Sequence, residues 1–368
     1  MFPRNPKTLL CAGSLIGLIF MSGCGEEITT TTRLLPGGGI ERELSLENSK
    51  PDAPADWGPI PVDAKWAVSM TPSRLPDAKN GETAYRHTLN RRFSSTREML
   101  ADLARHPDDG SMLIPEIAWA KKWRGFYSVY SFREYYPVPT VFRHIPARDF
   151  FSPGEFSLLQ KAMDDEKAVK RDHPQIELDA LGDKYEKWIA RSVAEDLFRA
   201  VLSEADGRGD SVASKWLRDG RDDVLAAMIK VLDIPDHNPA KGPEPFVKGL
   251  DELLRTDLFR GFLERKSPAL MAWEKRWRFI DGRLLDSFPF RLIMPGLITA
   301  TNSLDMKGNA LSWKLDVIKL TLTGFEMTAE SRAVNWWAVG LAGLFLALLL
   351  ALLVRGVWIL RRRNGGPA

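Results

Sequence analysis

Cysteine is nearly absent from this chain of 368 residues, which contains only Cys11 and Cys24. Cys11 lies in an N-terminal apolar run that we expect to be removed, and Cys24 follows that run directly. The mature chain therefore excludes a disulfide framework and a cysteine-ligated metal site. Histidine is also scarce: the five histidines are scattered, with no HxxxH or HExxH pair, and we predict neither a metal nor a cofactor.

An excess of charge of one sign is lacking as well. The formal net charge is +3, and part of it comes from the C-terminal cluster at residues 361–363. Nucleic-acid binding normally needs a basic face on a folded domain, and no such stretch stands out, so we exclude this class. The exported part also lacks GxSxG, SxxK, Walker-type and GxGxxG sequences, which argues against an enzyme without excluding one.

The N-terminal residues are typical of a secretory signal. Arg4 and Lys7 precede an apolar stretch from Leu9 to Met21, which is too short to span a bilayer. The stretch ends in Met21-Ser22-Gly23-Cys24, which resembles the lipobox of bacterial lipoproteins. The resemblance implies that residues 1–23 are removed and that Cys24 carries the lipid. An ordinary cleaved signal, or an uncleaved anchor that happens to contain cysteine, is the alternative.

The C-terminal part predicts a membrane-spanning helix over residues 333–360. Residues 333–354 carry no charged side chain, and about 20 apolar residues suffice to cross the hydrocarbon layer. Trp336, Trp337 and Trp358 lie at its margins, where indole rings favour the headgroup region. The arginines of the tail 361–368 mark the cytoplasmic side, so we expect the preceding chain to be extracytoplasmic and the lipid to hold its start at the same bilayer surface.

Small residues recur every four positions within this predicted span. Gly343, Ala347 and Ala351 lie on one face, and such a stripe lets two helices approach closely in lipid. The stripe is therefore a candidate contact between two copies of the chain. Alanine is common in spanning helices, so chance also explains the pattern.

Strand patterns occur at both ends of the exported part. Residues 27–35 and 40–46 flank the turn Pro36-Gly37-Gly38-Gly39, which predicts a hairpin. Alternation returns after Asp281-Gly282 and continues to the predicted span. We therefore predict an α+β fold, in which residues 24–151 and 281–332 form one antiparallel β-domain that a helical insertion at 152–280 interrupts. Two consecutive domains are the alternative.

The middle of the chain has helical signals. Ser152-Pro153-Gly154-Glu155 is a capping box, and apolar residues keep helical spacing from Leu178 to Val201. The spacing ends at Asp206-Gly207-Arg208-Gly209. Further helices are expected at about 222–232 and 245–263. A shorter box at Ser95–Glu98 begins an isolated helix in the first β-rich part.

Residues 123–136 are the most aromatic stretch, and we predict one long strand with aromatic side chains on both faces. Exposed rings there would stack on sugars or contact acyl chains, whereas packing in a sheet core is the alternative. The candidate ligand contacts are Phe126, Tyr127, Tyr130, Phe132, Tyr135 and Tyr136.

The closing pattern adds a resemblance. Met294-Pro295-Gly296, Gly308-Asn309 and residues 329–332 before the span are similar to the membrane-proximal β-domain of LppM-like bacterial envelope lipoproteins. The likeness implies a lipobox, a β-rich exported domain and one C-terminal helix, and it assigns no catalytic residue. We therefore predict a binding, assembly or scaffold module of the cell envelope, whose partners are membrane lipid, other envelope proteins or a second copy. The alternative is an envelope hydrolase acting on lipid or peptidoglycan.

Overall fold

The computed structural model describes most of the chain after the predicted signal. The described residues are 28–48, 65–73, 84–103, 115–164, 169, 171–232, 243–268, 270–273, 276, 288–315 and 317–364. The predicted signal peptide, the lipobox and Cys24 lie outside these residues.

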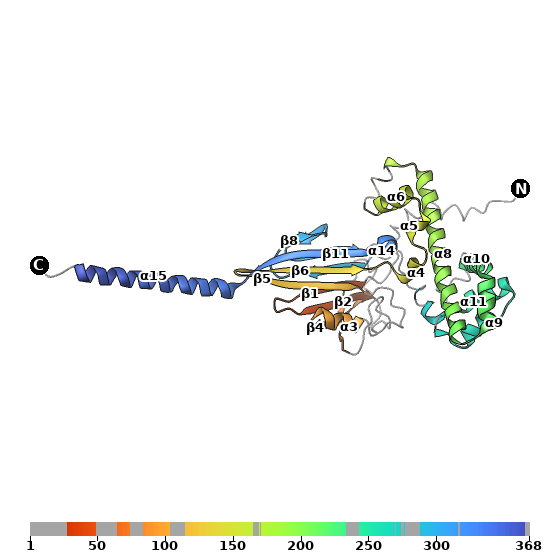
Figure 1. The fold of residues 1–368 in the computed structure, drawn as a ribbon, viewed down its shortest axis with the longest axis horizontal. Helices are drawn as coiled ribbons and strands as arrows, with labels where there is room; N and C mark the ends of the chain where they lie inside the picture. The colour runs from red at the N-terminus through yellow and green to blue at the C-terminus, as the bar shows by residue number, and fades with distance from the viewer. Residues whose placement is uncertain are drawn as a thin grey trace.

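Two β-sheets form the part of the molecule next to the C-terminal helix (Figure 1). The larger sheet has seven strands in the order β3-β4-β2-β1-β7-β10-β9, and the smaller has four in the order β5-β6-β11-β8. The larger sheet comprises β1 (Ile28–Leu34), β2 (Ile40–Asn48), β3 (Ala67–Ser73), β4 (Ala84–Phe93), β7 (Phe288–Ile293), β9 (Asp305–Lys307) and β10 (Ala310–Leu315). The smaller sheet comprises β5 (Glu116–Arg124), β6 (Tyr127–Tyr136), β8 (Leu297–Thr301) and β11 (Phe325–Val334).

Both sheets combine strands from the two ends of the chain, as predicted. Strand β1 pairs with β7, with Thr30 opposite Phe290, and β11 lies between β6 and β8. The α+β fold built from both ends is therefore confirmed. One pairing departs from an antiparallel domain: β1 and β7 are parallel, which the long helical connection between them allows.

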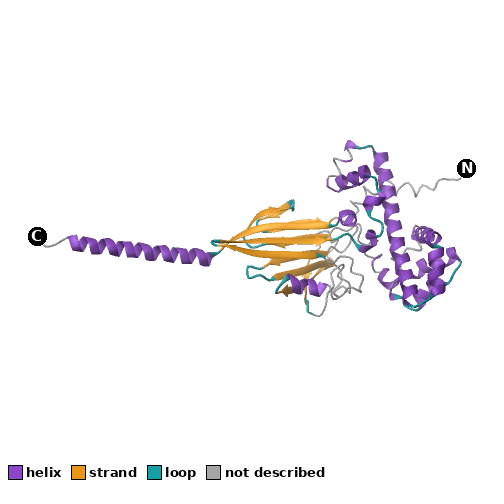
Figure 2. Cartoon of the chain, in the orientation of Figure 1, coloured by secondary structure: helices purple, strands orange, loops and turns teal. Residues whose placement is uncertain are grey.

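The sheets pack face to face because each buries one set of alternating side chains. On β2 the buried positions include Ile40 and Leu44, and on β6 they include Tyr130 and Phe132. Across the two layers, the rings of Tyr136 on β6 and Phe290 on β7 lie 5.3 Å apart between centroids. Figure 2 shows the strands gathered in one body and most of the helices in another.

The helices between β6 and β7 form this second body, around the long helix α8. They are α4 (Thr140–Arg143), α5 (Ala147–Phe150), α6 (Pro153–Asp164), α8 (Gln175–Gly207), α9 (Ser211–Asp219), α10 (Arg221–Leu232), α11 (Pro243–Leu254) and α12 (Leu258–Glu264). Helices α3 (Thr96–Leu103) and α14 (Val317–Thr323) accompany the sheets. The predicted capping box begins α6, since the Glu155 carboxylate accepts the Ser152 N–H at 2.7 Å and the Ser152 hydroxyl accepts the Glu155 N–H at 3.3 Å.

The strand directions place this helical body at one end of the sheets and α15 (Trp336–Asn364) at the other (Figure 1). Strand β11 runs toward α15, and β6 is antiparallel to it, so the chain leaves β6 for the helices at the far end. Strand β1 runs in the same direction as β11, toward α15. Its early residue Thr30 is level with Phe290, whose ring contacts Tyr136 at the end of β6 far from α15. Pro36, which follows β1, accepts a hydrogen bond from Tyr130, which is nearer to α15. Ile28 therefore lies at the far end of the sheets from α15.

Two local predictions were wrong. Residues 123–136 form a hairpin and not one strand, because Gly125 takes a left-handed φ of 69° and turns the chain between β5 and β6. The predicted helix at 245–263 is interrupted at Arg255, whose φ is 53°, so that α11 and α12 are separate helices. In both cases a local turn overrides a continuous apolar pattern.

Candidate functional site

Among the described residues, one helix is long and apolar enough to cross a membrane. Residues Trp336–Leu360 of α15 have a mean hydropathy of 2.6 in their most apolar window, and none of that window is buried in the chain. About 25 residues at 1.5 Å each give a length that exceeds a hydrocarbon layer of about 30 Å. The apolar surface of α15 is therefore left without a covering in the described part of the chain.

Asn335 joins α15 to the sheets. Its backbone N–H donates to the Phe126 carbonyl at 2.8 Å, its Nδ2 donates to the Gly125 carbonyl at 2.8 Å, and its Oδ1 accepts the Ser128 hydroxyl at 2.8 Å. The Asn335 carbonyl also accepts the first N–H groups of α15, at 2.9 Å from Ala338. One residue thus begins the helix through its backbone carbonyl and holds the tip of the β5–β6 hairpin through its side chain and N–H.

Aromatic side chains surround this junction. Trp123, near the end of β5, stacks on Trp337 with the ring centroids 6.1 Å apart and the planes inclined by 16°. Trp123 and Phe126 are 61% and 58% exposed, and Trp336 is 76% exposed. The Arg332 guanidinium lies 5.6 Å from the centroid of the Tyr127 ring. The junction therefore combines exposed rings with a cation.

The structure separates the aromatic residues that the sequence grouped together. Tyr130, Phe132 and Tyr136 point into the core between the sheets and are 2–4% exposed. Phe126 and Tyr127 are exposed at the hairpin tip, and Tyr135 is half-buried. Core packing accounts for Tyr130, Phe132 and Tyr136, whereas ligand contact at Phe126, Tyr127 and Tyr135 stays a prediction.

The small-residue stripe lies on the uncovered surface of α15. Gly343, Ala347 and Ala351 are exposed, and a Cβ added at Gly343 would meet no atom within 4 Å of the chain. Packing against a second helix at this stripe stays a prediction, as does the acylation of Cys24, which lies outside the described residues.

A charged cluster occupies the core between the sheets. Arg42 on β2 and Glu134 on β6 are each 1% exposed, and the Arg42 Nη2 lies 2.6 Å from Glu134 Oε2. The Glu134 carboxylate also accepts the Tyr136 hydroxyl at 2.6 Å, and Thr32 Oγ1 accepts the Arg42 Nε–H at 3.1 Å. Enclosed between the two sheets, this cluster joins them and offers no surface to a substrate.

The pKa values of Arg42 and Tyr136 in this cluster are shifted by burial and by the Glu134 carboxylate. Burial is the largest single influence on the pKa of Arg42 and would lower it, but the charges and hydrogen bonds of Glu134 and Tyr136 together outweigh burial, and the pKa is raised. Burial also raises the pKa of Tyr136 well above its usual range, and the Glu134 carboxylate raises it further. Both groups therefore keep their protons over the physiological range, which suits a structural cluster better than proton transfer.

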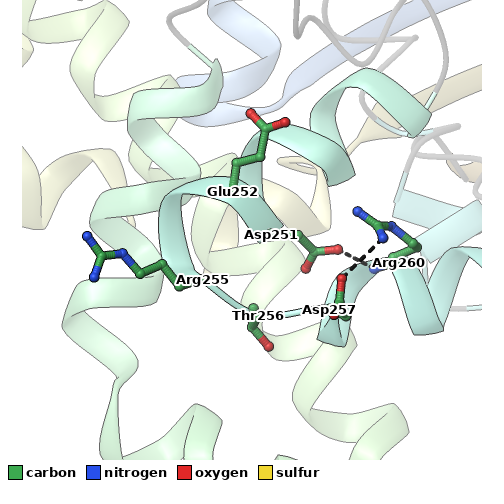
Figure 3. A pocket seen from close by; sticks show the side chains of 6 residues that line it. All are labelled: Asp251, Glu252, Arg255, Thr256, Asp257 and Arg260. Atoms are coloured by element: carbon green, nitrogen blue, oxygen red, sulfur yellow. Dashed lines mark hydrogen bonds and ion pairs between the residues drawn. The ribbon is translucent and has the colours of Figure 1, made fainter.

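A polar hollow of about 250 Å³ lies where α11 passes into α12 (Figure 3). Its central carboxylate, Asp251, accepts the backbone N–H groups of Phe259 at 3.0 Å and Arg260 at 2.8 Å. Asp251 thus caps the short helix α12 from the preceding helix. Burial raises the pKa of Asp251, and these two N–H groups oppose that effect. The hollow is accounted for by the packing of two helices.

The junction at Asn335 carries a signal in the sequence that the prediction did not use. Asn335 is a hydrogen-bonding residue inside the uncharged stretch 333–354, at the position where the strand pattern gives way to the apolar helix. Within the residues that the structure describes, no group of three His, Cys, Asp or Glu side chains is arranged to hold a metal ion.

Comparisons with known proteins leave the family open. No protein-family model matches the chain, and no curated protein matches it. The folded domain of LppM from Mycobacterium tuberculosis, solved by NMR, aligns with 84% of this chain and 91% of its own length, at 9% sequence identity and a TM-score of 0.25. The resemblance to LppM-like lipoproteins is thus weak, and a superposition this loose carries no argument about function.

Proposed function

We propose that this chain is a membrane-anchored module of the bacterial cell envelope that lies outside the cytoplasm and binds or assembles other envelope components. In this proposal α15 spans the membrane, and the arginines at 361–363 lie on its cytoplasmic side. The uncovered apolar surface of Trp336–Leu360 supports the span, because lipid satisfies that surface better than water does.

The observation that carries the proposal is the rigid joint at Asn335. Strand β11 ends at Val334 and α15 begins at Trp336, so no flexible linker separates them. Three hydrogen bonds between Asn335 and residues 125–128 hold the joint, two donated by Asn335 and one by the Ser128 hydroxyl. Because β11 is 10 residues long, the sheets would act as a stalk of about 33 Å that holds the helical body away from the bilayer.

The helical body is the part that we propose to meet partners. It lies at the end of the sheets opposite α15 (Figure 1), and it exposes apolar side chains such as Ile176 on α8 (83%) and Val212 on α9 (79%). The hydrolase alternative gains no support from the hollow between α11 and α12, because the Asp251 carboxylate that lines it is engaged by two backbone N–H groups of α12.

Two further contacts belong to the proposal, and neither is needed for attachment. Acylation of Cys24 would give the chain a lipid close in sequence to β1, and the stripe of Gly343, Ala347 and Ala351 would bring two copies together. Replacing Gly343 and Ala347 by isoleucine should abolish a detergent-stable dimer, and an unchanged dimer would remove the stripe from the proposal.

Two measurements test the proposal. Protease added to intact spheroplasts should digest the sheets and the helical body and leave a protected fragment that contains α15. If the globular part is spared, or if carbonate washes the chain from membranes, the proposed topology is wrong. A photo-crosslinking residue at Val212 should then capture a recurrent envelope partner by mass spectrometry, whereas the same residue at the exposed Val68 on β3 serves as the matched control. Equal labelling from both positions would contradict a binding role for the helical body.

A further inference from the structure

Five large apolar side chains are exposed around the first turn of α15, and they come from three separate segments. We call them the junction rim: Trp123, Phe126, Leu297, Trp336 and Trp337. Each is 58% to 76% exposed. An isolated exposed apolar residue needs no explanation, but five at one end of a β-domain indicate a contact surface.

The rim is fixed to the start of α15 by hydrogen bonds, by one ring contact and by strand pairing. Asn335 binds the hairpin tip that carries Phe126, and Trp123 stacks on Trp337. On the other side, Arg332 is paired with Leu297 in the β11–β8 ladder. The preceding residue, Gly296, lies so close to β11 that a Cβ there would overlap the Arg332 carbonyl oxygen. These contacts therefore hold the rim residues beside the first turn of α15.

Cationic side chains lie among these apolar residues. Lys122 and Arg124 are exposed on β5, and Arg332 is exposed on β11 beside the Tyr127 ring. Long cationic side chains beside exposed indoles match the boundary of a bilayer, where acyl chains meet phosphate groups.

We infer that the junction rim inserts into the headgroup region of the bilayer that α15 crosses, so that the β-domain rests on lipid as well as being tethered to it. This inference rests on the proposed span. When the apolar part of α15 fills a hydrocarbon layer of about 30 Å, its first turn lies in the interfacial layer that adds roughly 5–7 Å on each side. The rim lies at the level of this first turn. Because the rim continues directly into the span, lipid is the occupant that covers it.

The chain offers a matched pair of leucines for the test. Leu297 begins β8 at the rim, and β8 runs away from α15, so Leu304 in the following turn lies farther from the junction. Leu297 is 72% exposed and Leu304 is fully exposed. Each leucine is replaced by a spin-labelled cysteine in the full chain with Cys11→Ala and Cys24→Ala. The labelled protein is reconstituted in vesicles of phosphatidylcholine and phosphatidylglycerol.

The rate at which each spin label collides with oxygen is compared with its rate of collision with a water-soluble nickel chelate. The ratio of the two rates reports the depth of the label in the bilayer. We expect the label at 297 to be at least about threefold less accessible to nickel than the label at 304. A third label at Leu348, in the middle of α15, tests the span itself. The rim inference is overturned if the labels at 297 and 304 have the same nickel accessibility, whether both are exposed or both are shielded. The span stands in either case, provided that the label at 348 is shielded from nickel. If 348 is accessible to nickel, the proposed function fails.

A second substitution separates lipid contact from mere proximity. Phe126→Ser and Val68→Ser both remove an exposed apolar side chain, which is 58% and 60% exposed respectively. With the label kept at 297, Phe126→Ser should raise the nickel accessibility and Val68→Ser should leave it unchanged. An equal effect of both variants would also overturn the inference.

Discussion

The Arg42 guanidinium on β2 binds the Glu134 carboxylate on β6 in the middle of the core, with Nη2 2.6 Å and 2.8 Å from its two oxygens. The two residues are 92 positions apart and belong to different sheets. Among the described residues, Arg42 Nη1 is buried and finds no hydrogen-bond partner. The pair therefore fixes how the sheets face each other more than it adds to their stability, because both charges had to be removed from water.

Removing one partner of this pair should destabilise the fold strongly. Arg42→Met leaves Glu134 as a buried carboxylate opposite an apolar side chain, and we expect the free energy of unfolding to fall by about 3–5 kcal/mol. The double variant with Glu134→Met should regain part of this loss, because no buried charge remains. Chemical denaturation of the detergent-solubilised chain, followed by tryptophan fluorescence, measures the differences.

The neighbouring surface pair provides the control. Arg33 and Glu41 belong to the same β1–β2 ladder and lie 3.4 Å apart, but they are 52% and 30% exposed. Arg33→Met should lower the free energy of unfolding by less than about 1 kcal/mol. A loss as small as this for Arg42→Met, or additive effects in the double variant, would contradict the role given to the buried pair.

A side chain at Gly296 should destabilise the fold strongly, whereas a side chain at Gly308 should destabilise it only moderately. Both have positive φ angles, 78° and 65°. A Cβ at Gly308 would meet nothing within 4 Å, but one at Gly296 would clash with the Arg332 carbonyl and the Ala333 backbone. We expect Gly308→Ala to cost about 1 kcal/mol from backbone strain, and Gly296→Ala more than about 2 kcal/mol. Equal shifts in the unfolding midpoint would show that β8 moves away from β11 freely.

Replacing Asn335 should loosen the joint between the sheets and α15. Asn335→Ala removes the hydrogen bonds to Gly125 and Ser128 and leaves the buried Ser128 hydroxyl without its acceptor. The distance distribution between spin labels on α15 and on the β-domain should broaden. Asn302→Ala is the matched control: Asn302 binds Trp313, Thr328 and Glu326 within the sheets, so its loss should lower stability and leave that distribution unchanged.

Much of the fold could be predicted where the pattern of side chains is local. The turn at 36–39 between two alternating segments predicts β1 and β2, and the Ser152–Glu155 box predicts the beginning of α6. The uncharged stretch at residues 333–354 predicts α15. Each of these elements is determined by residues within a few positions of one another.

Besides the two local turns at Gly125 and Arg255, a further failure of prediction has a tertiary cause, because contacts between distant segments place charged side chains inside the fold. Strand β4 went unpredicted because its inward positions hold His87 and Arg91 beside Leu89 and Phe93, which hides the period of two. Arg42 and Glu134 occupy inward positions of β2 and β6 in the same way. Opposite charges in the apolar phase of two strands are a signal for a buried pair, but the sequence alone does not tell which strands face each other.

The candidate surface could be predicted only in part. The tryptophans at 336 and 337 mark the margin of the span from the sequence alone. That Trp123 and Leu297 join them depends on the pairing of β5 with β6 and of β8 with β11, which a single sequence does not reveal.

The stability of the helical body should depend on pH through Glu155. Hydrogen bonds from Lys184 and from the Ser152 N–H lower the pKa of this carboxyl to about 2. Because the folded pKa lies below the unfolded value, the stabilisation is present above about pH 4.5 and is lost as the pH falls toward 2. The melting temperatures of the wild type and Glu155→Gln should therefore differ slightly at neutral pH and converge near pH 2. Lys184→Met should reduce the same pH-dependent difference, and a constant difference would contradict this assignment.

Attachment to the membrane should not require Cys24. Ile28 lies at the end of the sheets far from α15, and nine steps along β6 separate the two ends by about 30 Å. The four steps from Cys24 to Ile28 span at most about 14 Å when extended, so the Cys24 sulfur stays about 16 Å short of the bilayer of α15 while the sheets stand upright on it, and an acyl chain there cannot insert over its full length. This geometry departs from the expectation that the lipid holds the start of the domain at that surface.

Cys24→Ala should leave the chain resistant to carbonate extraction, whereas Leu348→Arg with Leu349→Arg should release it, because two charges at the middle of a span are unfavourable by several kcal/mol. Release by Cys24→Ala alone would show that the lipid, and not α15, is the main anchor.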